Sequence, residues 1–461
     1  MLSIMDLFAG CGGLSLGFEQ AGFTPIFVNE LNDDARATYL ANRHHSIGEA
    51  KFSSTPALIS SDVAELDESR LVRLSDDLQQ LGADIRFGKN GSVDVVAGGP
   101  PCQGFSGIGH RRSYGVDRSA LPSNQLFQNM ASVIEFVRPR IFLFENVRGL
   151  LSARWSAQGE RGEIWRDVFG RFRQLGDEFG YTVRWSLVHA KDYGVPQNRP
   201  RILLVGIRND VIVDEPDIID VTADEYDAIK CGFLPKGGKK APHLNEVLGD
   251  LVDPSIDRTL RSQDFPASFK SSNYVQPANS EIQKYFRPGD LAKKGAPLTE
   301  QEYSKHALKI VEKFSAMQEN GGVIPDEFTT KKFAQRLLPA EWAKTGPFIT
   351  ATSMPDDYVH FCQPRILTVR EWARLQTFPD WYEFRGKRTT GGLRRAGNPR
   401  LGIFDRETPK YTQIGNAVPV SLASAVGEHF KGILASAGFI TYPSERPVAQ
   451  AKQRLRYAVG S

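Results

Sequence analysis

The chain has 461 residues, of which 41% are hydrophobic and 24% charged, values typical of a folded globular protein. Its four cysteines form neither a disulfide framework nor a zinc-ligand pattern, and no apolar run is long enough to cross a bilayer. We therefore expect a cytoplasmic protein of two or three domains, and the net charge of +3 allows an anionic partner without requiring one.

The first sixty residues predict a ligand pocket at the ends of two strands. A strand over 2–8 runs into a glycine turn, and a helix is expected from about Leu14 to Ala21. Glycine allows a sharp turn and a close ligand, and a helix N-terminus presents free N–H groups. A second strand over 25–28 ends at Glu30, about twenty residues beyond Gly10, the spacing at which an acid binds ribose hydroxyls.

A glycine turn alone is weak evidence for any one ligand. A plain strand–turn–helix unit explains it equally simply, and a dinucleotide is the other obvious candidate. The pattern here is Gly-Cys-Gly-Gly, with Ser15 where the third glycine of the dinucleotide motif belongs. Residues elsewhere in the chain must therefore decide which ligand, if any, this turn binds.

The run 93–97 is rich in β-branched residues and predicts a buried parallel strand. Two glycines and two prolines stop that strand and lead into Cys102. A cysteine at the carboxyl end of a central strand lies where open α/β sheets bind ligands. The alternative is a small buried residue in a tight turn.

Two later strands carry charged side chains. The strand over 140–147 contains Glu145, whose pKa an apolar setting would raise, although a strand-end salt bridge is the simpler alternative. A strand over 202–206 follows Arg199 and Arg201. We expect these arginines on opposite faces, one toward a pocket and one toward a phosphate, with a pair of solvated arginines as the alternative.

The segments Asp6–Gly13 (DLFAGCGG) and Pro100–Ser106 (PPCQGFS) resemble the S-adenosylmethionine-binding and catalytic motifs of the DNA cytosine-5 methyltransferases. Four further blocks follow in that family's order, so that the resemblance spans Asp6 to Gly427. It implies an α/β fold: a Rossmann-like methyltransferase domain with a smaller, mostly irregular or β target-recognition domain. The implied division is 1–209 for the first part of the catalytic domain, 210–408 for recognition including a 365–382 motif, 409–440 for a helix returning to the catalytic domain, and 441–461 for a tail.

The resemblance also implies roles for individual residues. Phe8 would pack on the adenine of S-adenosyl-L-methionine, Glu30 would bind its ribose and Asp62 its amino group. Cys102 would be the nucleophile that adds to cytosine C6, Glu145 the proton partner, and Arg201 with Arg199 the electrostatic support. The full cofactor set implied is Phe8, Gly10, Cys11, Gly12, Gly13, Leu14, Glu30, Asp62, Val63, Pro100 and Asn416.

Double-stranded DNA is the implied substrate, with the target cytosine flipped out of the helix. The DNA contacts expected are Gln103, Ser106, Arg111 and Arg112 in a glycine-rich basic loop, and Arg394 and Arg395 in the basic segment 386–410. That basic segment could equally be a disordered linker. No motif in 210–344 identifies a residue that reads bases.

We expect a monomer without metal or membrane contact, associated with the nucleoid, that protects host DNA from a restriction endonuclease acting on the same site without direct contact. One alternative is a tRNA cytosine-5 methyltransferase, although the Cys-Phe-Thr element of that branch is absent. The other is a catalytically inactive DNA-binding regulator. Two helices are also expected: one that Thr368 and Glu371 cap and Pro379 ends, and a last one over 419–437.

Overall fold

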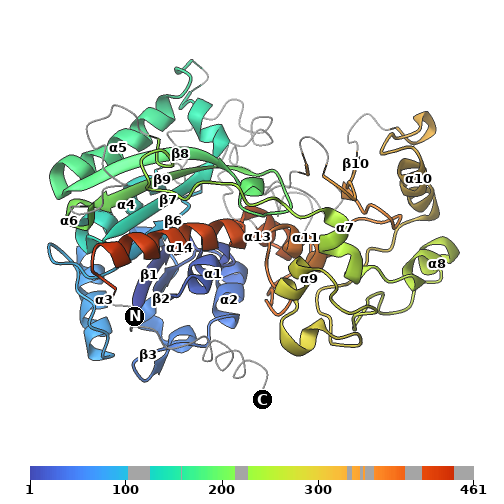
Figure 1. Cartoon of the computed structure of the whole chain (residues 1–461), viewed down its shortest axis with the longest axis horizontal. Coiled ribbons are helices and arrows are strands. Elements are labelled where there is room, and N and C mark those ends of the chain that lie inside the picture. Colours follow the sequence, from blue (N-terminus) through green and yellow to red (C-terminus); the bar gives the residue numbers. More distant parts are fainter. Residues whose placement is uncertain are drawn as a thin grey trace.

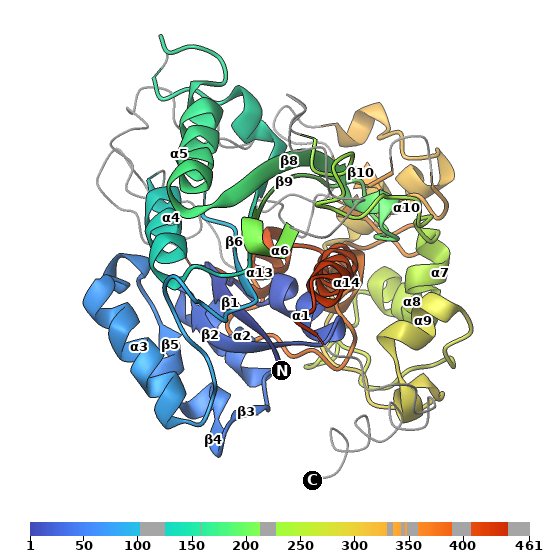
Figure 2. The same cartoon turned by 60° about the vertical axis from the view of Figure 1, so that its left-hand side comes forward.

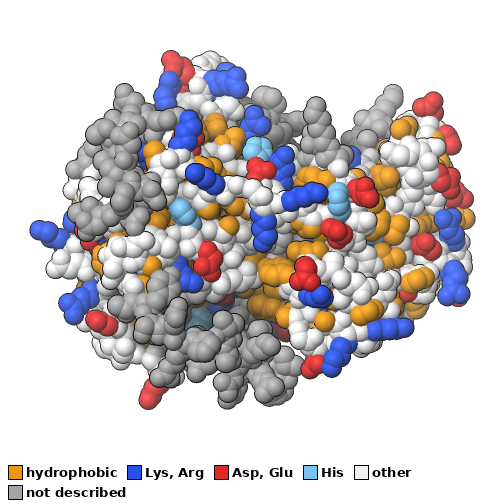
Figure 3. All heavy atoms as spheres, viewed as in Figure 1, with side chains coloured by type: hydrophobic (Ala, Val, Ile, Leu, Met, Phe, Trp, Pro, Cys, Tyr) orange, Lys and Arg blue, Asp and Glu red, His pale blue; other side chains and the backbone are white. Residues whose placement is uncertain are grey.

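The computed structural model describes residues 1–101, 125–156, 158–212, 227–329, 335–342, 346–347, 358–389 and 407–440. They form two lobes (Figure 1): a sheet flanked by helices, and a lobe of short helices joined by long irregular segments. Among the described residues no helix is both long and apolar enough to cross a membrane. On the face in Figure 3, acidic and basic side chains are interspersed, as the small net charge leads one to expect.

The described part of the first lobe contains a sheet of seven strands in the order β5-β2-β1-β6-β7-β9-β8. The strands are β1 Leu2–Leu7, β2 Phe23–Asn29, β5 Ile59–Ser60, β6 Val95–Gly98, β7 Ile141–Val147, β8 Tyr181–His189 and β9 Pro200–Arg208. From β5 to β7 neighbouring strands are parallel, whereas β9 is antiparallel to both of its neighbours. The first five strands therefore present their carboxyl ends at one edge.

Helices cover both faces of this sheet, which explains why the central strands are apolar throughout (Figure 2). The helices on one face are α3 Glu68–Gln80, α4 Leu126–Val137 and α5 Glu163–Phe179. The other face packs against α1 Gly13–Gln20 and α14 Val420–Ser436. Helix α2 Asp33–Ala41 lies beside α1, where the Tyr39 hydroxyl is 2.9 Å from the Ser15 hydroxyl. The short α6 Asn209–Ile212 follows β9, and a small hairpin joins β3 Ser46–Ile47 to β4 Ala50–Lys51.

Helix α14 brings the end of the described chain back to its beginning. The apolar stripe predicted for it is buried: Val420, Leu422, Val426, Phe430 and Ile433. Glycines allow the close approach to α1, since a Cβ atom built on Gly17 would lie 2.4 Å from the Cβ of Ala423. The C-terminal segment is thereby fixed beside the first strand–turn–helix unit.

The second lobe is mostly irregular, as expected, but its described regular elements are largely short helices. They are α7 Leu244–Leu248, α8 Ser255–Ser262, α9 Glu281–Phe286, α10 Leu308–Glu319, α11 Val369–Leu375 and α13 Lys410–Asn416, with the two-residue strands β10 Arg336–Leu337 and β11 Tyr358–Val359. Helix α13 is separate from α14, whereas the sequence suggested one final helix.

Helix α11 begins with the predicted capping box. The Thr368 side chain accepts from Glu371 N at 3.2 Å, and Glu371 Oε2 accepts from Thr368 N at 2.9 Å. Every residue of the helix is buried, rather than one face of it. Its charged side chains are buried because other parts of the lobe supply partners.

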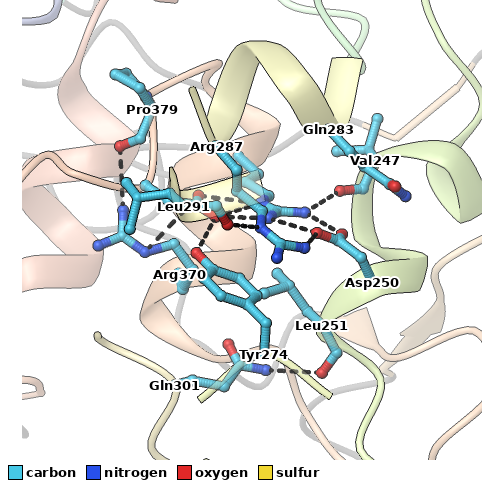
Figure 4. A network of polar contacts seen from close by, with 12 residues as sticks. Val247, Asp250, Leu251, Tyr274, Gln283, Arg287, Leu291, Gln301, Arg370 and Pro379 are labelled. Atoms are coloured by element: carbon cyan, nitrogen blue, oxygen red, sulfur yellow. Dashed lines mark hydrogen bonds and ion pairs between the residues drawn. The ribbon is translucent and has the colours of Figure 1, made fainter. Parts of the chain in front are cut away.

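Those partners form a polar core in the second lobe (Figure 4). Asp250 accepts from Arg287 Nη1 at 2.6 Å and from Arg374 Nη1 at 2.5 Å. Arg374 also pairs with Asp380, whose Oδ2 accepts from the Tyr274 hydroxyl at 2.6 Å. Removing one partner of a buried ion pair of this kind typically costs about 3–5 kcal/mol. We therefore expect a single substitution in the network to destabilise the fold strongly.

Candidate functional site

The site lies where the carboxyl ends of β1, β6 and β7 meet. Leu7 at the end of β1 pairs with Gly98 at the end of β6, and Gly98 pairs with Phe144 on β7. The glycine turn after β1 and the segment after β6 therefore start side by side, next to Glu145. This is the edge at which an open α/β sheet binds its ligands.

The turn after β1 has three residues in the left-handed region: Phe8 with φ 56°, Gly10 with φ 56° and Gly12 with φ 85°. Phe8 is the costly member, because this conformation disfavours a residue with a side chain by roughly 1–2 kcal/mol. At Gly10, no described atom lies within 4 Å of the position that a Cβ would occupy. One side of the turn is therefore open.

Glu30, at the end of β2, is bound to this turn. Its Oε2 accepts from Gly10 N and its Oε1 from Asn32 N, both at 2.7 Å. Burial raises the pKa of this carboxyl, and the two N–H donors oppose that shift. Glu30 thus fixes the turn, and its role in binding ribose stays a prediction.

Four other residues of the implied cofactor set differ in their surroundings. Asp62 lies at the end of the neighbouring strand, where its Oδ1 accepts from Ala64 N at 2.9 Å. Cys11, Leu14 and Val63 are buried. The Cys11 thiol donates to Gln413 O at 3.4 Å, and burial raises its pKa to about 12, so its side chain faces the protein and not an open pocket.

Sequence reasoning missed Leu31 at this edge. Its side chain is 69% exposed directly after Glu30, although large apolar side chains are usually covered. Its position could have been predicted, because an apolar residue directly follows the end of the second strand.

The C-terminal segment closes the other side of the turn. A Cβ on Gly13 would lie 2.4 Å from Val418 O and 3.2 Å from the Cβ of Ala417. Asn416, the last residue of α13, is exposed just before this contact. The structure therefore brings Asn416 near the start of α1 from more than 400 residues away in the sequence.

Glu145 forms an ion pair at the ends of β6 and β7. Its Oε1 lies 2.5 Å from Nε of Arg201, with 8% of Glu145 and 4% of Arg201 exposed. A Cβ on Gly99 would lie 2.7 Å from Glu145 Oε2, so any larger residue there would require the carboxylate or the backbone to shift. The strand-end salt bridge considered as an alternative is present, and a guanidinium replaces the apolar setting expected for Glu145.

The expected division of the two arginines between opposite faces is wrong. Residues two apart on a strand share a face, and both side chains are buried, with only 1% of Arg199 exposed. Arg199 Nη2 donates to Gly415 O, just before Asn416. Burial and, to a lesser extent, the charge of Arg201 lower the pKa of Arg199, against the opposing influence of Glu145.

Two amides also contribute here, and sequence reasoning gave them no role. Asn146 Nδ2 donates to Pro100 O at 3.0 Å and so holds the backbone just after β6. Gln197 Nε2 donates to Leu375 O and to Gln376 Oε1, each at 2.7 Å, and connects the site to the end of α11. Both roles could have been suspected, because Asn146 directly follows Glu145 and Gln197 lies two residues before Arg199.

Several expected site residues lie outside the described residues: Cys102, Gln103, Ser106, Arg111, Arg112, Arg394 and Arg395. The described residues stop at Pro101, directly before Cys102, and resume at Gln125. Within the described ranges, no group of three His, Cys, Asp or Glu side chains is arranged to hold a metal ion.

Comparison with known proteins agrees with this geometry. A family model described as C-5 cytosine-specific DNA methylase matches residues 2–432. Type II methyltransferase M.DdeI of Desulfomicrobium norvegicum is 29% identical over 93% of this chain and 88% of its own length. M.BspRI of Lysinibacillus sphaericus is 30% identical, over 96% of this chain and 85% of its own. In fold, the chain is similar to a crystal structure described as a prophage-encoded DNA modification methyltransferase of E. coli, with TM-score 0.60, 21% identity, and coverage of 94% and 100% of the two chains.

Proposed function

Because this chain belongs to the C-5 cytosine-specific DNA methylase family, we propose that it methylates C5 of a flipped-out cytosine in double-stranded DNA through a covalent bond between Cys102 and C6. The observation that carries the proposal is the Glu145–Arg201 pair. It lies against Gly99, three residues before Cys102 in the sequence.

The reaction needs a nucleophile because cytosine C5 is too weak a nucleophile by itself. Addition of the Cys102 thiolate to C6 forms an S–C bond and turns C5 into an enamine-like carbon. C5 then takes the methyl group as the S–CH3 bond of S-adenosylmethionine breaks, and S-adenosylhomocysteine leaves. Loss of the C5 proton and expulsion of the thiolate then restore the aromatic ring. Glu145 is suited to hold the N3 edge of the base, and Arg201 to stabilise charge there.

S-adenosyl-L-methionine supplies an electrophilic methyl group when bound, and the described residues fit this donor. The open side of Gly10 allows close approach, and the first turn of α1 presents backbone N–H groups. Glu30 and Asp62 stand at adjacent strand ends, where they can accept from ribose hydroxyls and the adenine amine. We infer that exposed Leu31 covers one face of the adenine.

A flipped base follows from the reaction, because neither face of a stacked cytosine can be reached by a thiol. The relatives named above are Type II methyltransferases. We propose that this chain, like an enzyme of a Type II system, protects a site that a companion endonuclease cleaves without contacting that endonuclease, and that it acts as a monomer.

The test begins by mapping 5-methylcytosine in host DNA with and without an active gene, which gives the recognition sequence. A duplex with 5-fluorocytosine at that site should then trap wild-type protein covalently. Cys102→Ser should trap none, whereas Cys362→Ser, which changes an exposed cysteine of the second lobe, should trap normally.

Each other outcome contradicts part of the proposal. Labelled methyl groups in tRNA but not in DNA would identify an RNA enzyme, and no transfer to either would identify an inactive member. Methylation that survives Cys102→Ser would exclude the covalent route.

A further inference from the structure

The glycine turn after β1 is held from behind by two side chains, Tyr382 and Arg43. The Tyr382 hydroxyl donates to Cys11 O at 2.6 Å, and Arg43 Nη2 donates to Gly12 O at 3.1 Å. The two donors are linked, because Arg43 Nη1 donates to the Tyr382 hydroxyl at 2.7 Å. Both side chains are almost completely buried.

The two contacts act on the turn in different ways. The N–H across the peptide from Cys11 O is that of Gly12, which donates to Ala9 O at 2.9 Å, so the Tyr382 contact fixes the turn itself. The Arg43 contact bears on the next N–H. A peptide unit is planar, and its carbonyl and N–H point in opposite directions. Gly12 O is held by Arg43 and by Leu16 N, which donates at 3.0 Å, and this aims the N–H of Gly13 away from Arg43. Gly13 begins α1, so this N–H has no acceptor within the helix and is available to a ligand.

Arg43 is itself held firmly in place. Its Nε donates to Glu19 Oε1 at 2.9 Å, and its guanidinium carbon lies 3.7 Å from the centre of the Tyr39 ring. A Cβ on Gly12 would lie 2.5 Å from Arg43 Nη1, so turn and guanidinium are in direct contact. Because the donor to Tyr382 is charged, it polarises the phenol and strengthens the bond to Cys11 O.

Tyr382 comes from the segment just after α11, whereas the turn belongs to the first strand of the sheet. Its ring packs against Phe378 and Phe384, with ring centres 4.9 and 5.5 Å away. The ring thus has a packing role that phenylalanine would preserve, and the hydroxyl alone reaches the turn. Burial raises the pKa of Tyr382, so the phenol stays protonated and can donate at neutral pH.

We propose that Tyr382, polarised by Arg43, is a positioning residue for the methyl donor. The second lobe thereby sets the geometry of the cofactor pocket through one hydroxyl group. This inference rests on the proposed function, namely use of S-adenosylmethionine in that pocket. It implies that removal of the hydroxyl weakens donor binding while leaving the chemistry at Glu145 and Cys102 intact.

The experiment compares Tyr382→Phe with Tyr411→Phe in the full chain. Tyr411 is a matched control: it is also buried, and its hydroxyl donates to Leu367 O at 2.7 Å instead of to the backbone of the glycine turn. Calorimetry with S-adenosylhomocysteine should show Kd rising about five- to tenfold in Tyr382→Phe and unchanged in Tyr411→Phe. The KM for S-adenosylmethionine should rise in parallel, with kcat at saturating donor within about twofold of wild type.

A second variant, Arg43→Lys, keeps the charge but cannot serve Gly12 O and Tyr382 with one planar fork, so the same rise in Kd is expected. Wild-type affinity in Tyr382→Phe would overturn the proposal. So would equal losses in both tyrosine variants, since these would show a purely structural role. If wild-type protein binds no S-adenosylhomocysteine, it is the proposed function that fails, and the variants are not needed to show it.

Discussion

Arg201 Nε and Glu145 Oε1 lie 2.5 Å apart at the carboxyl edge of the sheet, with both residues nearly excluded from water. This pair connects the antiparallel strands β7 and β9. Arg201 lies opposite Val147, two residues along β7 from Glu145. A carboxylate fixed in this way can present its second oxygen to a base without moving. The geometry leads to a direct test of Glu145.

Glu145→Gln keeps the shape of the side chain and removes its charge and its ability to exchange a proton. We expect kcat for methyl transfer to fall by about 10²–10⁴-fold, the usual contribution of a positioned acid or base. Donor affinity should stay near wild type, because Glu145 is not among the groups that hold the glycine turn. Single-turnover assays with a labelled methyl group would measure the first effect and calorimetry the second.

The matched control is Asp94→Asn. Asp94 also forms a buried ion pair in this sheet, with Arg140 Nη1 at 2.6 Å, and it accepts from Ser3 N at 2.7 Å. It precedes β6, at the opposite end from Glu145. Its loss should lower Tm but leave kcat of the folded protein unchanged. Equal losses of kcat in the two variants would remove the case for Glu145.

Gly99→Ala tests the contact between the segment after β6 and the catalytic carboxylate. The added Cβ would lie 2.7 Å from Glu145 Oε2, so either the carboxylate or the backbone must shift. We expect kcat to fall at least tenfold, since a displacement of about 1 Å at a reacting group costs up to about 100-fold.

Gly170→Ala is the control for the same chemical change. Gly170 lies in α5, and, apart from the backbone of that helix, no described atom comes within 4 Å of the position a Cβ would occupy. Alanine should stabilise that helix by roughly 0.5–1 kcal/mol without changing activity. Full activity in Gly99→Ala would show that Glu145 tolerates displacement.

Asp6 gives stability an unusual dependence on pH. Burial raises its pKa from 3.8 to about 7, against the opposing influence of the Ser15 hydroxyl and Arg43. The folded state therefore binds a proton that the unfolded chain releases above pH 3.8. This contribution to stability is complete below that pH and is lost as pH rises through about 7. Asp6→Asn should flatten the fall in Tm between about pH 4 and 7, and an unchanged slope would show that Asp6 is ionised in the folded state over this range.

Glu371 has the opposite behaviour. Burial alone would raise its pKa, but Arg365 at 2.6 Å outweighs burial and brings the value down from 4.5 to about 2. Its contribution to stability is present above pH 4.5 and is lost as pH falls toward 2. Acid should therefore open the second lobe, and hydrogen exchange of α11 amides should accelerate over this range. Glu371→Gln should cost about 3–5 kcal/mol near pH 7 and remove that acid transition.

The sequence predicted the parts of the fold that depend on local pattern. Apolar runs located β1, β2, β6, β7 and β9, and the spacing of Thr368 and Glu371 located the start of α11. Helices α4 and α5 and strand β8 were not predicted, because no chemical motif drew attention to them.

Contacts between distant segments could not be found in this way. Tyr382 reaches Cys11 across 371 positions, and Gly13 contacts Val418. No local spacing encodes such pairs. The error over Arg199 and Arg201 had a different origin, since it assigned residues two apart to opposite faces when strand geometry puts them on one.

The basic segment 386–410 gives a last prediction, drawn from sequence because Arg394 and Arg395 lie outside the described residues. If both side chains neutralise phosphates, their replacement by glutamine should reduce the slope of log K for DNA binding against log salt by about 2, since each phosphate contact contributes about 0.9. Recognition should be weakened to a similar degree on cognate and non-cognate duplexes, because phosphates carry no sequence information. Lys293→Gln is a suitable control, because that exposed lysine pairs with Asp290 at 2.7 Å and should leave the slope unchanged. A double variant with the wild-type slope would assign the segment to a linker that does not touch DNA.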